Sequence, residues 1–206
     1  MKILMMDQGS TSWHQARLGV ITASEADALI SPTFKIRKGD GVDSYLYKKI
    51  AEKVLNWSPE MLDAFPLEQG KIIETVAIPW YAFTYNCKPQ RVGFCITDNG
   101  LCGCSPDAVL EDGTGLEIKA PQGPNMIRYL LEGVVPEQYR VQLQYSLWVT
   151  KAPRWKFVAY SMTLPALVVN VEPDPVAQEA ITQAVEAFVV RFKESMNRIN
   201  QMRDAS

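Results

Sequence analysis

Apolar residues recur every three or four positions along much of the chain, and this spacing predicts helices with one buried face. The expected helices cover residues 12–17, 22–30, 44–55, 67–85, 125–132 and 139–150, followed by a long C-terminal helix that begins at Pro175. Strands are predicted at 90–97, 155–161 and 167–171, where β-branched and aromatic residues dominate. Helices followed by a run of strands, and then helices and strands together, predict one α/β domain with a central mixed β-sheet flanked by helices.

The segment 105–121, which reads Ser-Pro-Asp-Ala-Val-Leu-Glu-Asp-Gly-Thr-Gly-Leu-Glu-Ile-Lys-Ala-Pro, predicts two further short strands around a tight turn. Its Asp112-Gly113 pair is typical of hairpin turns. In the second strand, apolar and charged residues alternate, so Glu117 and Lys119 share one face of the sheet. Asp107 arrives from the first strand, directly after a proline.

The register of this hairpin decides whether Asp107 and Glu117 can act together. A two-residue turn at Asp112-Gly113 pairs Asp107 with Ile118 and places it on the opposite face from Glu117. A shared site therefore requires a bulge, an odd-length loop or a bend near Pro106.

Two carboxylates and a lysine at one end of a small sheet can hold a hard divalent cation beside a polarised water. Asp107, Glu117 and Lys119 thus indicate metal-assisted phosphodiester hydrolysis. The alternative is a solvated hairpin on which Glu117 and Lys119 form an ordinary surface ion pair. The pattern by itself leaves both interpretations open.

Two short helices are expected to meet near the N-terminus. Gly19 ends the first as a glycine beyond a helix C-terminus, and Thr22 with Glu25 forms the Thr-x-x-Glu pattern of a capping box at the second. Arg17 and Ser24 lie beside these helix ends and are candidates for binding an anion. An ordinary capped corner between helices explains the same residues equally well.

Two other stretches carry charges that could serve a site or merely face solvent. The segment 31–42 contains lysines, an arginine and glycines, and is expected to be a basic loop that contacts phosphates or is simply solvated. Glu74, with uncharged residues at 73, 75 and 76, is a candidate for a further metal-directed carboxylate or an exposed helix residue.

Composition narrows the possible classes of protein. With 206 residues, 47% of them hydrophobic, the chain is expected to form a single domain over residues 1–206. Its net charge of −2 gives no general attraction to nucleic acid, so DNA binding would depend on local basic patches. The sole histidine, His14, leaves no second histidine for a zinc site, and any serine or cysteine triad would have to use it.

The cysteines and the hydropathy pattern bear on location. The four cysteines lack metal-binding spacing, and three lie in apolar strand-like sequence, which favours buried thiols in a reducing cytosol. No apolar run approaches membrane-spanning length, and the N-terminal segment is too short for a signal peptide. A soluble, intracellular protein without a membrane partner is therefore expected.

Several of these stretches together resemble the phage lambda exonuclease family of viral recombination nucleases, which is YqaJ-like and belongs to the PD-(D/E)xK superfamily. The matching pieces follow in order: Trp13-His14, Arg17 to Glu25 (Arg-Leu-Gly-Val-Ile-Thr-Ala-Ser-Glu), Gly70-Lys71 with Glu74, Ser105-Pro106-Asp107, Gly115 to Lys119, and Gln142 to Thr150 (Gln-Leu-Gln-Tyr-Ser-Leu-Trp-Val-Thr). They span most of residues 13–150, and the longest two pieces are specific. The resemblance therefore favours the hydrolytic interpretation of the hairpin.

The resemblance implies a restriction-endonuclease-like nuclease core and an activity. The family's enzymes degrade one strand of double-stranded DNA from an end in the 5′-to-3′ direction and expose a 3′ single strand for recombination by annealing. The implied cofactor is magnesium, as two ions for which manganese can substitute. The implied assembly is a homotrimer, with a single-strand annealing protein as partner, in a phage or prophage setting and hence in the cytoplasm of a bacterial host.

The resemblance also implies roles for individual residues. Asp107, Glu117, Glu74 and the carbonyl of Ile118 would hold the metals, and Lys119 would orient or deprotonate the attacking water. Contacts to phosphate oxygens would come from Arg17, Ser24, Ser105 and Gln142. Leu67 stands where the family has a wedge that separates the terminal base pair.

One position departs from the family's pattern. The arginine that binds the terminal 5′-phosphate corresponds to Asn125 here, and Arg128, one helical turn later, is a candidate replacement. Two alternatives to an exonuclease stay open: a structure- or site-specific DNA endonuclease of the same superfamily, and a non-catalytic DNA- or partner-binding module.

Overall fold

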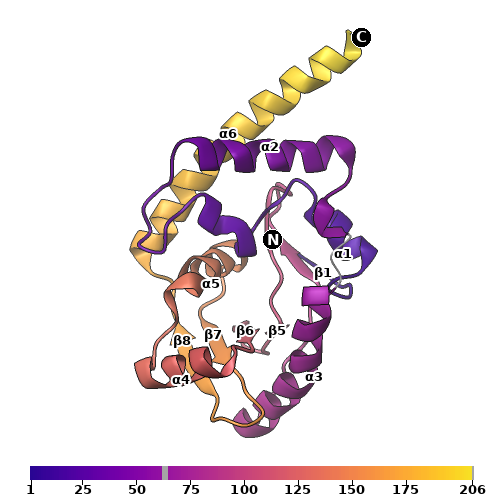
Figure 1. The fold of residues 1–206 in the computed structure, drawn as a ribbon. Helices are drawn as coiled ribbons and strands as arrows, with labels where there is room; N and C mark the ends of the chain where they lie inside the picture. The colour runs from indigo at the N-terminus through magenta and orange to yellow at the C-terminus, as the bar shows by residue number, and fades with distance from the viewer. Residues whose placement is uncertain (62–64, 206) are drawn as a thin grey trace.

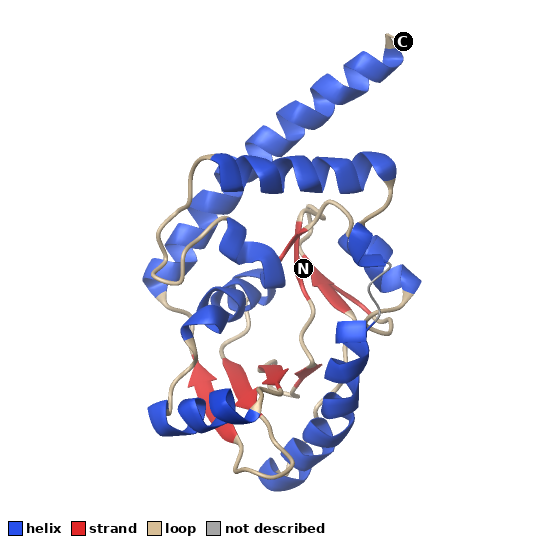
Figure 2. Cartoon of the chain, viewed as in Figure 1, coloured by secondary structure: helices blue, strands red, loops and turns tan. Residues whose placement is uncertain are grey.

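The computed structural model describes residues 1–61 and 65–205; the side chains of residues 60 and 65–72 lie outside that description. In chain order, its helices are α1 (Thr11–Arg17), η1 (Ala23–Ala28), α2 (Asp40–Leu55), η2 (Pro59–Met61), α3 (Phe65–Tyr85), α4 (Gly123–Glu132), α5 (Glu137–Thr150) and α6 (Pro175–Asp204). Its strands are β1 (Lys2–Leu4), β2 (Ile21–Thr22), β3 (Phe94–Ile96), β4 (Cys102–Cys104), β5 (Ala108–Val109), β6 (Gly115–Lys119), β7 (Trp155–Ala159) and β8 (Leu167–Val171). Figure 1 follows them by colour along the chain, and Figure 2 separates helices from strands.

The strands form two four-stranded sheets, one in the order β1-β3-β4-β2 and the other in the order β5-β6-β7-β8. Each sheet is mixed, because β2 runs parallel to β4 and β6 runs parallel to β7 while the other pairs are antiparallel. The α/β class with mixed sheets flanked by helices is confirmed. The prediction of one central sheet did not foresee that the strands are divided between two.

Helix α5 joins the two sheets. It contacts β3 and β4 of the first sheet, β7 of the second, and also η1 and α6. Its residues Val141, Leu143, Tyr145, Leu147 and Val149 are all buried, so it is apolar on most of its circumference. A helix in this position can present polar side chains to a site between the sheets.

Helix α6 covers the outer side of α5. Asp174 caps its N-terminus by accepting hydrogen bonds from the backbone N–H groups of Val176 and Ala177, and Pro175 occupies the first turn, as predicted. The first part of α6 buries Ile181, Val185, Phe188 and Phe192. Its C-terminal end projects beyond the remainder of the chain (Figure 1).

The expected capping box at residues 22–25 is wrong, and the expected helix there is a short 3₁₀ helix. Thr22 makes no side-chain hydrogen bond to the backbone of η1. Its hydroxyl instead donates to Glu25 Oε2 at 2.7 Å. Lys48 and Lys49 both bind the Glu25 carboxylate, which directs it toward α2 instead of back to the backbone at the helix start.

The cysteine prediction holds for the thiols themselves. All four cysteines are free, and Cys95, Cys102 and Cys104 are buried. Burial raises the pKa of Cys102, and burial also holds the pKa of Cys104 well above its usual range. None of the described helices is long and apolar enough to cross a lipid bilayer.

Candidate active site

The hairpin formed by β5 and β6 has the register that a shared carboxylate site requires. Ala108 pairs with Leu116 and Val109 with Gly115, and the backbone N–H of Leu110 donates to the carbonyl of Thr114 at 2.8 Å. The loop is therefore residues 111–113, an odd length, with Gly113 at a φ of 82°. The predicted odd-length loop is confirmed, and the backbone N–H of Asp107 donates to the carbonyl of Leu116, the residue before Glu117, at 3.0 Å.

Asp107 is tied to the strand that carries its partners. Its Oδ2 accepts a hydrogen bond from the backbone N–H of Ile118, the residue between Glu117 and Lys119. Gln8 steadies the segment before it, since its Nε2 donates to the carbonyl of Pro106 at 2.8 Å and to that of Val92 at 3.1 Å. Gln8 was missed in the sequence, where an isolated glutamine near the N-terminus carries no recognisable signal.

Glu117 connects β6 to helix α5. Its side chain is buried at 3% exposure, because β6 is a central strand that lies between β5 and β7. Glu117 Oε1 accepts a hydrogen bond from Gln142 Nε2 of α5 at 2.6 Å and lies 2.6 Å from Lys119 Nζ. The carboxylate is thus held by an amide and an ammonium before any other ligand is considered.

The charges of the cluster shift one another. Burial raises the pKa of Asp107 well above its usual range, and the nearby carboxylates of Glu117 and Glu74 add to this effect. For Lys119, burial lowers the pKa, but attraction to Glu117 and Asp107 outweighs it and the net pKa is raised. With these protein groups alone, Lys119 is a stable cation, which favours orienting a water over deprotonating it.

Glu74 reaches the cluster from α3, a helix that packs against β6. Its carboxylate lies 3.9 Å from the guanidinium of Arg91. Because its charge contributes to the raised pKa of Asp107, Glu74 lies near that carboxylate and not on a remote solvent face. The helix thus delivers a third acidic group to the end of the hairpin.

A cavity of about 430 Å³ contains most of the residues that the sequence singled out. Its described lining joins the acidic cluster and the anion-binding candidates: Arg17, Ser24, Glu74, Ser105, Asp107, Glu117, Lys119 and Gln142. Gln8, Trp13, His14, Ala23 and Ser146 complete this lining. Residues that are roughly 130 positions apart in the chain meet in this cavity, because α5 contacts both sheets and holds them together.

Three predicted residues lie elsewhere or are not described. Asn125 and Arg128 are exposed on α4, and the described structure does not include them in this cavity. The Arg128 guanidinium lies over the ring of Tyr129, 5.2 Å from its centre. The side chain of Leu67 falls outside the described part of the structure. Ile118 packs into the core between the sheet and α3, with its backbone beside the carboxylates.

Trp13 organises the part of the cavity wall that carries Arg17 and Ser105. Its Nε1 donates to Ser105 Oγ at 2.9 Å, and the Arg17 guanidinium lies 4.2 Å from its ring centre. Arg17 also donates to Ser24 Oγ at 3.4 Å. The sequence did not identify Trp13 as an organiser, because a buried tryptophan on a short helix is normally only a core residue. The structure adds that Arg17, Ser24 and Ser105 are held on one side of the space.

Four charged side chains of α2 and η1 form an ion-pair network that helps to hold this wall in place. Glu25 lies 2.7 Å from both Lys48 Nζ and Lys49 Nζ, and Lys49 also lies 3.0 Å from Glu52. Glu52 accepts the backbone N–H of Gly19 at 3.0 Å. Burial acts to raise the pKa of Glu25, but the two lysines prevail and lower it from 4.5 to about 2.

The carboxylates suit a hard cation by the chemistry of their donors. Asp107, Glu117 and Glu74 offer oxygen ligands of the kind that magnesium prefers. Burial and, after it, the negative charges of Glu117 and Glu74 raise the pKa of Asp107, and a divalent cation would relieve the repulsion between these carboxylates. Among the described side chains, however, no three acidic, histidine or cysteine groups converge as a ready ligand set, so side-chain adjustment has to accompany metal binding.

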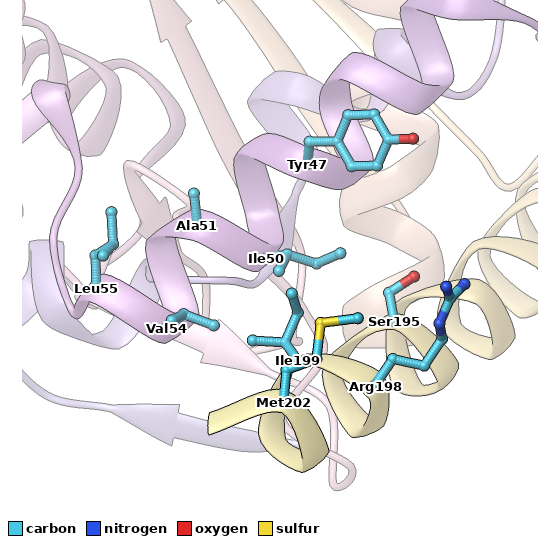
Figure 3. A pocket seen from close by; sticks show the side chains of 9 residues that line it. All are labelled: Tyr47, Ile50, Ala51, Val54, Leu55, Ser195, Arg198, Ile199 and Met202. Carbon is cyan, nitrogen blue, oxygen red and sulfur yellow. The ribbon is translucent and has the colours of Figure 1, made fainter. Parts of the chain in front are cut away.

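A second cavity of similar size, about 420 Å³, lies between α2 and the projecting part of α6. Figure 3 shows Ile50 and Val54 of α2 facing Ile199 and Met202 of α6. Arg198 is the one charged residue in its described lining. An apolar groove without converging polar groups lacks the means for hydrolysis, so the acidic cavity is the candidate active site.

Comparison with known proteins places the chain in a family. The model of the YqaJ-like viral recombinase domain matches residues 12–153. No curated protein sequence matched the chain.

Solved structures agree on the fold. The crystal structure of an alkaline exonuclease, LHK-Exo, from Laribacter hongkongensis has a TM-score of 0.81 at 22% identity, over 95% of this chain and 99% of that one. The same enzyme in complex with dAMP gives 0.80 at 21%, with the same coverage. A phage-related exonuclease from Haemophilus somnus gives 0.65 at 12%, over 87% of this chain and 96% of that one.

Proposed function

Because the chain belongs to the YqaJ-like viral recombinase family, we propose that it is a metal-dependent deoxyribonuclease that degrades one strand of duplex DNA from a 5′ end. The observation that carries this proposal is the meeting of Asp107, Glu117 and Lys119 with Arg17 and the other anion-binding candidates in one cavity. The shared fold with two exonucleases supports it. The product would be a duplex with a 3′ single-stranded end, suited to recombination by annealing.

The metal site would use Asp107, Glu117, Glu74 and the carbonyl of Ile118. When bound there, two magnesium ions, or manganese in their place, would activate a water and stabilise charge on the attacking and leaving oxygens. The chain's own contribution is to hold these oxygens in place: Ile118 N–H fixes Asp107, and Gln142 fixes Glu117. Each of these two carboxylates is thus held by a hydrogen bond without a metal, and side-chain adjustment would complete the ligand set.

Lys119 would position the water and balance charge. Its Nζ lies 2.6 Å from Glu117, and its pKa is raised, so it enters the reaction as an ammonium. An ammonium can donate hydrogen bonds to a water and to a phosphate oxygen at once. A role in deprotonating the water would require the pKa to fall when cations occupy the site.

Arg17, Ser24 and Ser105 would hold the terminal nucleotide through its 5′-phosphate. The guanidinium and the two hydroxyls line the same cavity as the carboxylates and supply hydrogen-bond donors there. Since Asn125 and Arg128 are on the exposed face of α4, the terminal phosphate would depend chiefly on Arg17 in this chain. Leu67 stays a candidate for the wedge that parts the terminal base pair.

The apolar groove between α2 and α6 supports the proposal of protein partners. Leu55, Tyr47 and Met202 are each at least 60% exposed there, which is costly in water unless another surface covers them. A homotrimer and a single-strand annealing protein are the proposed partners, and the cytoplasm of a bacterial host is the proposed location.

The test is digestion of duplex DNA labelled at the 5′ or the 3′ end, with and without magnesium. The proposal predicts magnesium-dependent release of the 5′ label as short product, while a covalently closed circle stays intact. Cleavage of the closed circle would favour an endonuclease of the same superfamily instead. No cleavage of any DNA, together with no magnesium binding in calorimetry, would favour a non-catalytic binding module.

A further inference from the structure

The acidic cluster is open on two sides. A separate cavity of about 330 Å³ shares Gln8, Glu74 and Asp107 with the candidate active site. Its own described lining adds Thr75 and Arg91, among others. Asp107 and Glu74 therefore stand between two spaces, each within the volume range of small-ligand sites.

We propose that this smaller cavity, lined by Arg91, is the subsite for the nucleotide on the 3′ side of the scissile phosphate. We propose also that Arg91 binds the phosphate that follows this nucleotide. The inference rests on the proposed function, because it assumes that Asp107 and Glu117 mark the position of the scissile bond. It assigns the two cavities to the two sides of that bond.

The assignment follows from the distribution of donors. The first cavity holds Arg17, Ser24 and Ser105, and so suits the terminal nucleotide with its dianionic 5′-phosphate. A strand that enters this cavity and passes the carboxylates must continue through a space that also borders them. The smaller cavity with Arg91 meets this requirement, since Asp107 and Glu74 line both this cavity and the candidate active site.

Arg91 is suited to a backbone phosphate. Its side chain is 52% exposed, and its guanidinium lies 3.9 Å from Glu74. A partly exposed pair at this distance contributes little stability, so the guanidinium can turn to another anion at small cost. A Glu74 carboxylate that serves as a metal ligand no longer needs this counter-charge. Arginine then offers a planar pair of N–H donors to phosphate oxygens.

Gln8 and the backbone bridge between Gln90 and Val109 both tie the segment of Arg91 to the hairpin. The Gln8 amide donates to the carbonyl of Val92, next to Arg91, and to the carbonyl of Pro106, next to Asp107. One side chain thus bonds to the backbone next to the proposed phosphate contact and to the backbone next to the metal-directed carboxylate. Met6 and Val92 supply apolar surface for a sugar or base, and Asp7, the remaining acidic residue of the lining, is exposed to solvent.

The experiment pairs Arg91→Met with a change in the DNA. One duplex carries an uncharged methylphosphonate at the linkage immediately 3′ of the first scissile bond, and a second carries it several linkages away. We expect Arg91→Met to slow first-nucleotide release from normal DNA about tenfold, the scale of one charge-assisted contact. The nearby methylphosphonate should slow the unmutated protein by a similar factor. Combined, the two changes should give no further loss.

Two controls separate this role from general charge effects. Lys88→Met removes an exposed cation of the same segment that lies outside the described lining, and it should keep full sensitivity to the nearby methylphosphonate. The distant methylphosphonate should have little effect in any variant. Fluorescence anisotropy of the same duplexes in EDTA should show the same coupling in binding, without catalysis.

The outcomes distinguish the subsite from the activity. If the unmutated protein does not digest duplex DNA, the proposed function is wrong and the subsite falls with it. If digestion occurs but the losses from Arg91→Met and the nearby methylphosphonate multiply, the subsite assignment alone is wrong. The same conclusion follows if Arg91→Met behaves like Lys88→Met.

Discussion

Asp107 accepts a hydrogen bond from the backbone N–H of Ile118, a residue whose own side chain points into the core. This bond crosses the hairpin directly beyond the register Ala108–Leu116 and Val109–Gly115, which the odd-length loop sets. Because side chains alternate along a strand, the opposite register would have turned one of the two carboxylates away. The geometry of a turn thus decides whether two acidic residues form a site.

Asp107→Asn should abolish cleavage and yet stabilise the fold. The amide keeps the size of the side chain but cannot replace the charged ligand, so we expect turnover to fall by about 10³-fold or more. Burial beside Glu117 and Glu74 disfavours the charged form of Asp107, so its removal should raise the thermal midpoint in EDTA. Magnesium-dependent digestion by the purified variant, or a lower midpoint, would contradict this.

Lys119→Met should also abolish cleavage while leaving the chain folded. The apolar replacement removes the donor that lies 2.6 Å from Glu117 but keeps the length of the side chain. Circular dichroism and gel filtration should match those of the unmutated protein. A Lys119→Arg variant should recover only part of the rate, since the guanidinium keeps the charge but not the geometry.

Glu25→Gln should remove a stability that depends on pH. The pKa of Glu25 in the folded protein is about 2, below the 4.5 of the free group, so its contribution is fully present above pH 4.5 and declines as the pH falls toward 2. The full contribution is about 3 kcal/mol. Urea unfolding should show a large difference between variant and unmutated protein at pH 7, which narrows steadily below pH 4.5.

The control for this experiment is Asp43→Asn. Asp43 forms an exposed ion pair with Arg191 between α2 and α6, and such pairs contribute little. The free energy of unfolding of the Asp43→Asn variant should differ from that of the unmutated protein by less than about 1 kcal/mol, both at pH 7 and below pH 4.5. A Glu25→Gln effect as small as this would show that the buried network does not stabilise the fold.

Arg17→Ala should reduce turnover on 5′-phosphorylated ends strongly and on 5′-hydroxyl ends little. The guanidinium lies on the cavity wall, packed on Trp13, where it can anchor a dianionic phosphate. We expect the preference for phosphorylated ends to fall about tenfold or more. Arg128→Ala provides the comparison, since Arg128 is exposed on α4 and should leave the preference unchanged. Equal rates on both ends in the unmutated protein would remove the basis for this prediction.

Trp13→Phe should weaken binding of the terminal nucleotide more than it slows chemistry. Phenylalanine retains a ring for Arg17 but cannot donate to Ser105, so the serine hydroxyl loses its 2.9 Å partner. We expect KM to rise several-fold with a small change in kcat, as for loss of a uniform binding contact. Steady-state rates on 5′-phosphorylated duplex measure both quantities. A fall in kcat alone would assign Trp13 a different role.

The sequence by itself determined most of the helices and which charged residues share one face of a strand. Periodic apolar residues set the helices, and the Gly-Leu-Glu-Ile-Lys strand set Glu117 and Lys119 on one face, because both patterns depend on local backbone geometry. The strand predicted over 90–97 is shorter in the structure, Phe94–Ile96, the residues that lie in register with β1. Edges of strands depend on neighbours that the sequence does not reveal.

Tertiary structure decided how distant residues share a site. Gln8 and Trp13 act through contacts with residues more than 90 positions away, and Gln142 reaches Glu117 only because α5 lies between two sheets. Glu25 carries a capping pattern, yet two lysines on α2 draw its carboxylate away from the helix start, since opposite charges attract more strongly where burial lowers the local dielectric. Such choices follow from packing and electrostatics between elements, which no local pattern contains.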